Sequence, residues 1–318
     1  MINGKIIASL DIGLSAVMLL IVSCDKSGRF EIINEFGGIS RLGYGINKTN
    51  TLSKDRIDST LQLCKEIVEI ASRESVEKII ATATSGIKNT INKTQFLVEC
   101  RSRFNIFPNI LTEQEEARLI YKGASTNFID EVRPIVVIEV GGDTTYIAFG
   151  RKGSIIKSHI MEIGSFHIFD NPNKFKGLLS FLNPKLRATV SEEISDFRNE
   201  LFSWLEGSKP LFICSGTLAS IFYGVLSGRS VHSRANMEGK RCSLRTLMKV
   251  YASLSKKNLE ERKKIPGIDP ERAHTLPTAL NILYDTIKFL NAKEFILTTN
   301  GLRTGILKSY MEKSFFWN

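Results

Sequence analysis

The chain has 318 residues, enough for about two domains of ordinary size. Hydrophobic residues make up 42% of it and charged residues 24%, a balance that excludes an intrinsically disordered chain and a fibrous repeat. Lysine and arginine exceed aspartate and glutamate by ten, so the surface is basic. That charge suits a polyanionic partner, but it is equally compatible with a basic surface that has no partner.

Cysteine and histidine are too scattered for a disulfide framework or a zinc site. The five cysteines are odd in number and never have C-x-x-C spacing, and the four histidines show no metal-ligand spacing. The most apolar stretch, residues 6–22, carries Asp11 and Gly13 in its middle and is too short for a membrane helix. We therefore expect a cytoplasmic protein with no membrane association and no signal peptide.

The first part of the chain is predicted to form three strands followed by alternating helices and strands. A turn at residues 25–28, with the sequence Asp-Lys-Ser-Gly, joins the second and third strands. Ser53 is placed to cap the first helix, whose apolar residues recur at helical spacing. In chain order we expect strands at 5–10, 16–23 and 29–35, a helix from 53, a strand at 78–84, a helix at 94–104, a strand at 109–112 and a helix at 113–124.

The second part of the chain continues the alternation of strands and helices. A Lys- and Glu-rich segment at 253–267 is interpreted as a solvated helix and loop without a functional role. The expected elements are strands at 134–140, 144–149 and 154–160, helices at 175–182 and 191–205, a strand at 210–214, a helix at 218–226, a helix at 274–290, a strand at 294–298 and a helix at 301–310.

The opening pattern of the chain occurs twice. Residues 8–22 and 136–150 each contain an apolar strand, a carboxylate (Asp11 or Glu139), a glycine two positions on (Gly13 or Gly141) and a second apolar strand. We interpret this as a duplicated domain rather than two unrelated hairpins. The predicted domains are residues 1–124 and 125–300, with a C-terminal helix at about 301–318 packing back on the first domain.

Three turns rich in small residues are candidate phosphate cradles. They lie at residues 13–16, 141–145 and 215–217, and the last opens a helix. Consecutive backbone N–H groups in such turns bind phosphate oxygens, and glycine lets the backbone come close. The alternative for each is a plain tight turn.

Carboxylates stand beside two of these turns. Asp11 and Glu139 end apolar strands, and a pair of carboxylates facing each other across a cleft would suit Mg²⁺ together with phosphate oxygens and water. Glu113, Glu115 and Glu116 open a helix, where acidic residues complement the dipole and where one could also activate a water molecule. The chemistry of the residues alone leaves open which of the three would do so.

Ordered sequence blocks resemble the exopolyphosphatase / guanosine pentaphosphate phosphohydrolase family, within the superfamily of sugar kinases, actin and heat-shock chaperones. The most specific block is Glu-Glu-Ala-Arg-Leu-Ile at residues 115–120. The others are Asp-Ile-Gly at 11–13, Arg-Leu-Gly-x-Gly at 41–45, Ala-Thr-Ser at 83–85 with Asn92, Val-Ile-Glu-Val-Gly-Gly at 137–142, Ser-Gly-Thr at 215–217, Pro-Glu-Arg-Ala at 270–273 with Pro277, and Gly-Leu-Arg-x-Gly at 301–305.

The resemblance implies an α/β fold of two actin-like (ribonuclease H-like) domains, each with a mixed five-stranded sheet, and an interdomain cleft. It implies release of the terminal phosphate of polyphosphate or guanosine pentaphosphate, with Glu116 as catalytic base and a divalent metal, Mg²⁺ or Mn²⁺, on Asp11 and Glu139. The expected partner is the polyphosphate or guanosine polyphosphate substrate, with no nucleic acid, and the resemblance allows a homodimer. The phosphate-binding residues expected from the resemblance and the turns are Gly13, Leu14, Ser15, Lys88, Gly141, Gly142, Asp143, Thr144, Ser215, Gly216 and Thr217.

Several positions depart from the family pattern. The first loop has Leu14 and Ala16 in place of polar residues. The second has Asp143 in place of a glycine and Tyr146 in place of a glutamate, and Lys88 replaces an arginine. Three hypotheses follow: an active phosphatase, a sensor that binds a nucleotide or polyphosphate without hydrolysis, and a relative that acts on another phosphorylated substrate or depends on ATP.

Overall fold

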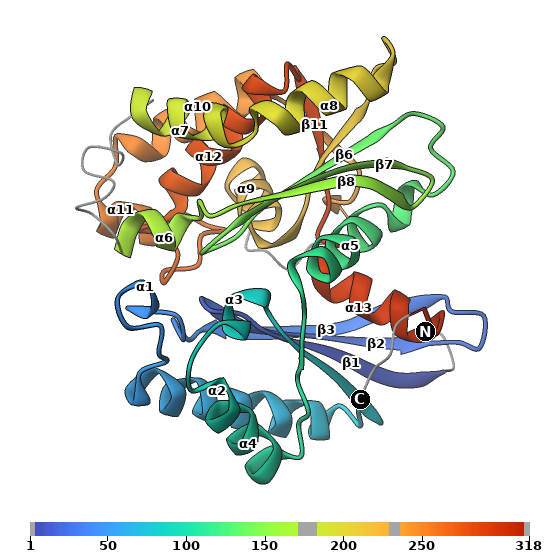
Figure 1. The fold of residues 1–318 in the computed structure, drawn as a ribbon, viewed down its shortest axis with the longest axis vertical. Coiled ribbons are helices and arrows are strands. Elements are labelled where there is room, and N and C mark those ends of the chain that lie inside the picture. Colours follow the sequence, from blue (N-terminus) through green and yellow to red (C-terminus); the bar gives the residue numbers. More distant parts are fainter. Residues whose placement is uncertain (1–3, 171–182, 229–235, 315–318) are drawn as a thin grey trace. The chain divides into compact units, whose positions relative to one another are not determined.

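The computed structural model describes residues 4–170, 183–228 and 236–314, in two compact units. The first unit comprises residues 1–123 and 302–318, and the second comprises residues 124–301 (Figure 1). The predicted helix at 175–182 and the last residues of the predicted C-terminal helix, 315–318, lie outside the described residues.

The sheet of the first unit has five strands in the order β3-β2-β1-β4-β5. Strands β1 to β3 form an antiparallel meander, whereas β4 runs parallel to β1. The bounds are β1 Lys5–Ile12, β2 Ala16–Cys24, β3 Phe30–Ile39, β4 Lys78–Ala83 and β5 Asn109–Ile110. The helices of this unit are α1 Ile46–Thr49, α2 Lys54–Arg73, α3 Ser85–Lys88, α4 Lys93–Phe104, α5 Glu113–Ala124, which ends at the boundary of the unit, and α13 Leu302–Met311.

Alternation along β1 divides the first unit into two faces. Ala8, Leu10 and Ile12 point into a core built with α2 and α4. Helix α13 packs against β1, β2 and β4, and α2 lies across the other face of the sheet (Figure 1). Asp11 therefore belongs to the face opposite the α2–α4 core, as its place between Leu10 and Ile12 dictates.

The sheet of the second unit has six strands in the order β10-β11-β9-β6-β7-β8. Strands β6 to β8 repeat the antiparallel meander, and β9 runs parallel to β6. The bounds are β6 Ile135–Val140, β7 Thr145–Arg151, β8 Ser154–Met161, β9 Leu211–Cys214, β10 Lys240–Ser243 and β11 Glu294–Leu297. The helices are the short 3-10 helix η1 Thr126–Phe128, α6 Ser165–Asp170, α7 Pro184–Glu193, α8 Ser195–Leu205, α9 Gly216–Ser227, α10 Leu244–Ser255, α11 Leu259–Lys263 and α12 Leu276–Phe289.

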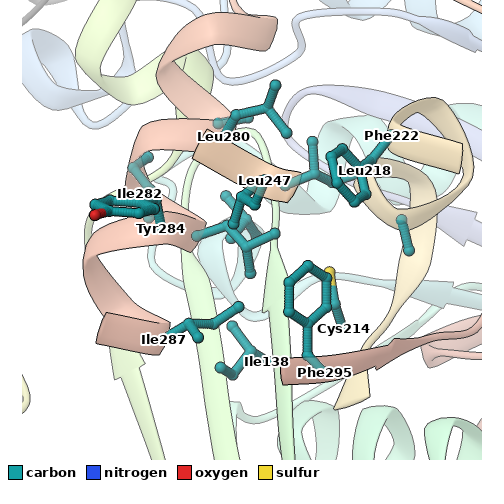
Figure 2. Packing of buried hydrophobic residues seen from close by; sticks show 14 of the residues in the cluster. Ile138, Cys214, Leu218, Phe222, Leu247, Leu280, Ile282, Tyr284, Ile287 and Phe295 are labelled. Atoms are coloured by element: carbon teal, nitrogen blue, oxygen red, sulfur yellow. The ribbon is translucent and has the colours of Figure 1, made fainter. Parts of the chain in front are cut away.

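The core of the second unit covers the face of β6 that carries Val136, Ile138 and Val140. These positions correspond to Ala8, Leu10 and Ile12 in the first unit. Figure 2 shows side chains of α9, α10 and α12 meeting those of the sheet in this core. The repeat that the sequence predicts is therefore present in strand order and in the faces of the strands.

The elements of the second unit differ from the expectation at several places, including the unexpected short helices η1 and α6. The predicted helix at 191–205 is two helices that break at Ile194, whose side chain is buried between them in the core. Strand β10 and helix α10 were not expected, and β10 adds a sixth strand by pairing with β11. The β10 sequence Lys-Arg-Cys-Ser is too polar and too short to give a strand signal, so tertiary pairing determines it.

Candidate functional site

The first acidic turn, residues 11–16, joins β1 to β2. The N–H of Gly13 donates to the carbonyl of Ala16 over 2.8 Å, which closes the turn. A Cβ on Gly13 would lie 3.1 Å from that same carbonyl oxygen, so the turn is tight at this position. Asp11 pairs with Met18 across the hairpin and with Thr82 of β4 on its other side.

The second acidic turn, residues 139–144, is closed by the equivalent backbone hydrogen bond. The N–H of Gly141 donates to the carbonyl of Thr144 over 2.9 Å, and a Cβ on Gly141 would approach that oxygen to 2.9 Å. Glu139 pairs with Tyr146 across the hairpin, as Asp11 pairs with Met18. The duplicated motif therefore folds into duplicated turns, each beside a strand-end carboxylate.

Leu14 gives the first turn an apolar side chain that packs on glycine. A Cβ on Gly43 would lie 2.8 Å from the Cβ of Leu14, and one on Gly86 would lie 2.5 Å from its Cδ1. The carbonyl of Leu14 accepts a hydrogen bond from Gly43, and that of Ser15 accepts from two successive N–H groups at residues 40 and 41. The sequence of the Gly-x-Gly block at 43–45 is thus explained in part by the space that Leu14 needs.

The second turn is held from the side by the segment before α6. The carbonyl of Gly142 accepts from the N–H of Phe166 over 2.7 Å, and that of Gly141 accepts from Ser165 over 3.1 Å. A Cβ on Gly164 would stand 2.3 Å from the carbonyl oxygen of Gly142, so this position requires glycine. With these carbonyls engaged, Asp143 and Thr144 lie half-buried at the tip of the turn.

Glu139 is enclosed by small residues of the second unit. Ser215 donates its hydroxyl to Oε2 of Glu139 over 2.6 Å. A Cβ on Gly216 would come within 2.8 Å of the carboxyl carbon, and one on Gly301 would come within 2.4 Å of Oε2. Two residues of the Ser-Gly-Thr block therefore meet the strand-end acid: Ser215 by a hydrogen bond and Gly216 by the close approach of its backbone. Thr217 lies half-buried in the first turn of α9.

The thiol of Cys214 next to this block is structural rather than reactive. Complete burial raises the pKa of the Cys214 thiol, and the nearby Glu139 carboxylate raises it further. A thiol in such surroundings stays protonated and is a poor nucleophile.

Glu238 is a residue of this region that the sequence motifs do not include. Its carboxylate accepts the hydroxyls of Thr298 and Thr299, each over 2.6 Å, and the N–H of Thr299 over 2.7 Å. It also accepts from the side-chain amide of Asn127. Because residues 298–300 lead directly to Gly301, Glu238 fixes the loop that borders Glu139. A lone glutamate before a short polar strand carries no local pattern, so only the fold identifies it.

Glu116 is the buried carboxylate of the first unit. It lies in the first turn of α5, its residue is 2% exposed, and its Oε2 accepts the N–H of Ser85 over 3.0 Å. Ser85 opens α3 at the carboxyl end of β4, next to Gly86 on which Leu14 packs. The structure thus gathers Leu14 and Glu116 around the start of α3.

The neighbouring glutamates have other roles. Thr112 and Glu115 form a reciprocal cap: Oε2 of Glu115 accepts the N–H and hydroxyl of Thr112 over 2.7 and 2.8 Å, and the N–H of Glu115 donates back to that hydroxyl. Glu113 is exposed in the first turn of the helix. The three acidic residues, which residue chemistry alone does not separate, therefore divide into a buried carboxylate, a cap and a surface charge.

Lys88 and Arg118, two basic residues of the sequence blocks, are exposed. Lys88 ends the four-residue helix α3. Arg118 lies on α5, two residues after Glu116. Arg41 has a positive φ of 51° and stacks its guanidinium 4.7 Å from the ring centre of Tyr44.

The two strand-end acids, one in each unit, are of the ligand type that a hard divalent cation prefers. Asp11 and Glu139 offer carboxylate oxygens, which Mg²⁺ prefers. Gly216 and Gly301 bring their backbones so close to the Glu139 carboxylate that a Cβ at either position would collide with it. Within the described residues no cluster of three or more His, Cys, Asp or Glu side chains is gathered for a metal, so the cation would need phosphate and water to complete its shell.

None of the helices in the described part of the chain has both the length and the apolar character needed to cross a membrane.

Duplicated three-stranded meanders extended by parallel strands, each with an acidic turn, define the actin-like class of two-domain α/β proteins. A crystal structure of an exopolyphosphatase from Cytophaga hutchinsonii has a TM-score of 0.83 at 20% identity and covers 97% of this chain and 98% of its own. The Aquifex aeolicus Ppx/GppA family member has a TM-score of 0.73 at 24% identity, with 98% and 99% covered. These likenesses concern the fold.

The sequence profile of the Ppx/GppA phosphatase family matches residues 20–314, and the chain belongs to this family. A bifunctional 3-dehydroquinate synthase/phosphatase of Fusobacterium nucleatum is 28% identical over 313 residues. That match covers 94% of this chain and 45% of the relative, so the chain spans less than half the length of that protein.

Proposed function

We propose that the chain is a phosphohydrolase that releases the terminal phosphate of inorganic polyphosphate or guanosine pentaphosphate, with Glu116 activating the water. The observation that carries the proposal is the separation of the three glutamates of α5. The carboxylate of Glu115 is engaged in the helix cap, whereas that of Glu116 is buried and oriented by the N–H of Ser85. A buried and oriented carboxylate is what a general base requires.

The reaction is an in-line displacement at the terminal phosphorus. Glu116 accepts a proton from water while the water oxygen bonds to phosphorus and the bridging P–O bond breaks. The shortened phosphate chain leaves with the bonding electron pair, and orthophosphate is released. N–H groups of the two acidic turns and of the Ser215–Thr217 block stabilise the charge on the non-bridging oxygens, and Lys88 adds a cation. A divalent cation, Mg²⁺ or Mn²⁺, held by Asp11 and Glu139, would neutralise charge on the phosphate oxygens.

A second candidate is a sensor that binds polyphosphate or a nucleotide without hydrolysing it. The half-buried Asp143 favours it, because its carboxylate stands at the tip of a turn that would approach phosphate. Leu14 favours it as well, since an apolar side chain packed on Gly43 and Gly86 makes no hydrogen bond to a phosphate oxygen.

The test is release of orthophosphate from polyphosphate and from guanosine pentaphosphate, with Mg²⁺ or Mn²⁺, by the wild type, Glu116→Gln and the matched variant Glu115→Gln. We expect Glu116→Gln to lose about 10²–10⁴-fold in rate with little loss of substrate binding, and Glu115→Gln to keep most of the rate. Equal rates for the wild type and Glu116→Gln would reject Glu116 as the base. Binding of either ligand without release by the wild type would establish the sensor.

A further inference from the structure

The excess positive charge of the chain is concentrated in one segment of the second unit. Residues 240–264 contain nine lysines and arginines against two glutamates, so this segment carries seven of the ten net positive charges. It covers β10, α10 and α11 and includes part of the stretch that the sequence suggests is merely solvated. A charge excess this local is a feature of a surface rather than of the whole molecule.

Helix α10 directs part of this charge outward. Leu247, Tyr251 and Leu254 are buried at positions i, i+4 and i+7, which turns Lys249 and Lys256 to the solvent face. An open hollow of about 490 Å³ lies there, lined by Lys249, Ala252, Ser253, Lys256, Lys257 and Glu261. It shares no residue with the two acidic turns or with the Ser215–Thr217 block.

The lysines of the hollow form no ion pair with Glu261, the acidic residue beside them. Oε2 of Glu261 accepts the N–H of Asn258 over 2.7 Å, and Asn258 in turn caps α11, so this carboxylate is engaged by the capping box. The ammonium groups of Lys249, Lys256 and Lys257 have no hydrogen bond or ion pair to any other residue that the structure describes. Other cations of the segment are engaged, such as Arg241 with Glu294 over 2.9 Å and Lys263 with Glu260 over 2.8 Å.

We infer that this hollow, the α10–α11 basic hollow, binds a stretch of inorganic polyphosphate away from the acidic turns. Three mobile point charges around an open space suit a flexible chain of phosphates, because an ammonium group imposes little geometry on its anion. Single-stranded nucleic acid would call for stacking surfaces, and none of the six lining residues is aromatic. The identity of this ligand rests on the proposed function.

The test compares two triple variants of equal net charge in the full chain. One replaces Lys249, Lys256 and Lys257 by alanine, and the control replaces Lys26, Lys54 and Lys65, which are exposed in the first unit. Isothermal titration in EDTA measures binding of sodium polyphosphate several tens of phosphates long, of tripolyphosphate and of polyuridylate with a matched number of phosphates. We expect the hollow variant to bind long polyphosphate about tenfold more weakly than the control variant, with tripolyphosphate binding unchanged.

A second variant, Ser253→Glu, places a negative charge among the lysines without removing any of them and should weaken long-chain binding in the same direction. Equal weakening by both triple variants would overturn the inference, because the effect would then be one of net charge alone. The inference would also be overturned, in favour of a nucleic-acid site, if polyuridylate bound the wild type as tightly as polyphosphate and this binding were lost in the hollow variant. A wild type that binds long chains through the hollow yet releases no phosphate would reject the proposed function and leave this inference standing.

Discussion

At the end of β1 the residue after the turn glycine is Leu14, whose side chain fills the space left by Gly43 and Gly86. At the end of β6 the equivalent residue is Gly142, and its carbonyl is held by the N–H of Phe166. The backbone hydrogen bond that closes each turn is the same, 2.8 Å in the first and 2.9 Å in the second. One backbone motif therefore carries an apolar side chain packed on two glycines in one unit and a glycine in the other.

The surroundings of the key carboxylates also differ between the two units. Glu139 receives the hydroxyl of Ser215 and is bordered by Gly216 and Gly301, in a loop that Glu238 fixes. The block that follows β4 instead directs the N–H of Ser85 to Glu116 on α5. The comparison indicates that the second turn is built around its own carboxylate, whereas the first unit provides the buried carboxylate proposed as the base.

The largest effect is expected at Gly216. The substitution Gly216→Ala places a side chain at a φ of +78° and within 2.8 Å of the Glu139 carboxyl carbon. We expect the free energy of unfolding to fall by about 2–4 kcal/mol, from backbone strain and crowding together. The matched change Gly13→Ala has neither positive φ nor a carboxylate contact, and denaturant unfolding should find a clearly smaller loss. Equal losses would show that the setting of Glu139 is no tighter than that of the first turn.

Removing the support of the loop that borders Glu139 comes next. Glu238→Ala leaves the nearly buried hydroxyls of Thr298 and Thr299 without their acceptor, at an expected cost of about 1–3 kcal/mol in unfolding free energy. Glu192→Ala, which removes an exposed glutamate from α7, should stay within about 0.5 kcal/mol of the wild type. A Glu238→Ala protein as stable as this control would mean that the loop needs no such support.

The charge of the second turn can be tested by Asp143→Asn. If the turn approaches phosphate, removing this carboxylate should tighten tripolyphosphate binding by about two- to tenfold, since a like charge is taken away from the anion. Asp130→Asn removes the same charge from an exposed site in the same unit and should leave the affinity nearly unchanged. Isothermal titration calorimetry measures these affinities. Equal affinities of the two variants for tripolyphosphate would show that Asp143 does not lie near the bound phosphate.

The smallest effect concerns the cores of the units. Helix α2 exposes one face, whereas α12 is buried along most of its length. The buried side chain of Asp285 on α12 accepts hydrogen bonds from the side chains of Asn281 and Arg187. Burial raises the pKa of Asp285 above its ordinary value of 3.8. The folded state therefore holds the proton more tightly than the unfolded state, and stability should fall as the pH rises from the ordinary toward the raised value.

The variant Asp285→Asn should not show this fall in stability with rising pH. Unfolding free energies measured over this pH range should show the wild type becoming less stable relative to Asp285→Asn as the pH increases. Parallel curves for the two proteins would contradict a raised pKa in the core of the second unit.

The sequence predicts the repeated hairpins because alternation of apolar residues and glycine placement are local signals. It fails where the determinant is tertiary. The helical pattern at 191–205 is interrupted at Ile194, which lies between α7 and α8, and β10 exists because β11 offers an edge. The role of Glu238 follows from a loop sixty residues away. Among the three glutamates of α5, the family resemblance selects Glu116, and the Thr-x-x-Glu spacing of Thr112 and Glu115 is a readable cap signal, whereas the hydrogen bond from Ser85 to Glu116 follows only from the fold.

In the proposed reaction, water attacks the terminal phosphorus of the substrate. This step can be followed by turnover of polyphosphate by the wild type in water enriched in heavy oxygen, with mass spectrometry of the orthophosphate released and of the shortened chain. We expect one heavy oxygen in each orthophosphate cleaved from the chain and none in the remaining chain. Heavy oxygen in the shortened chain, or no release of orthophosphate at all, would contradict the proposed reaction.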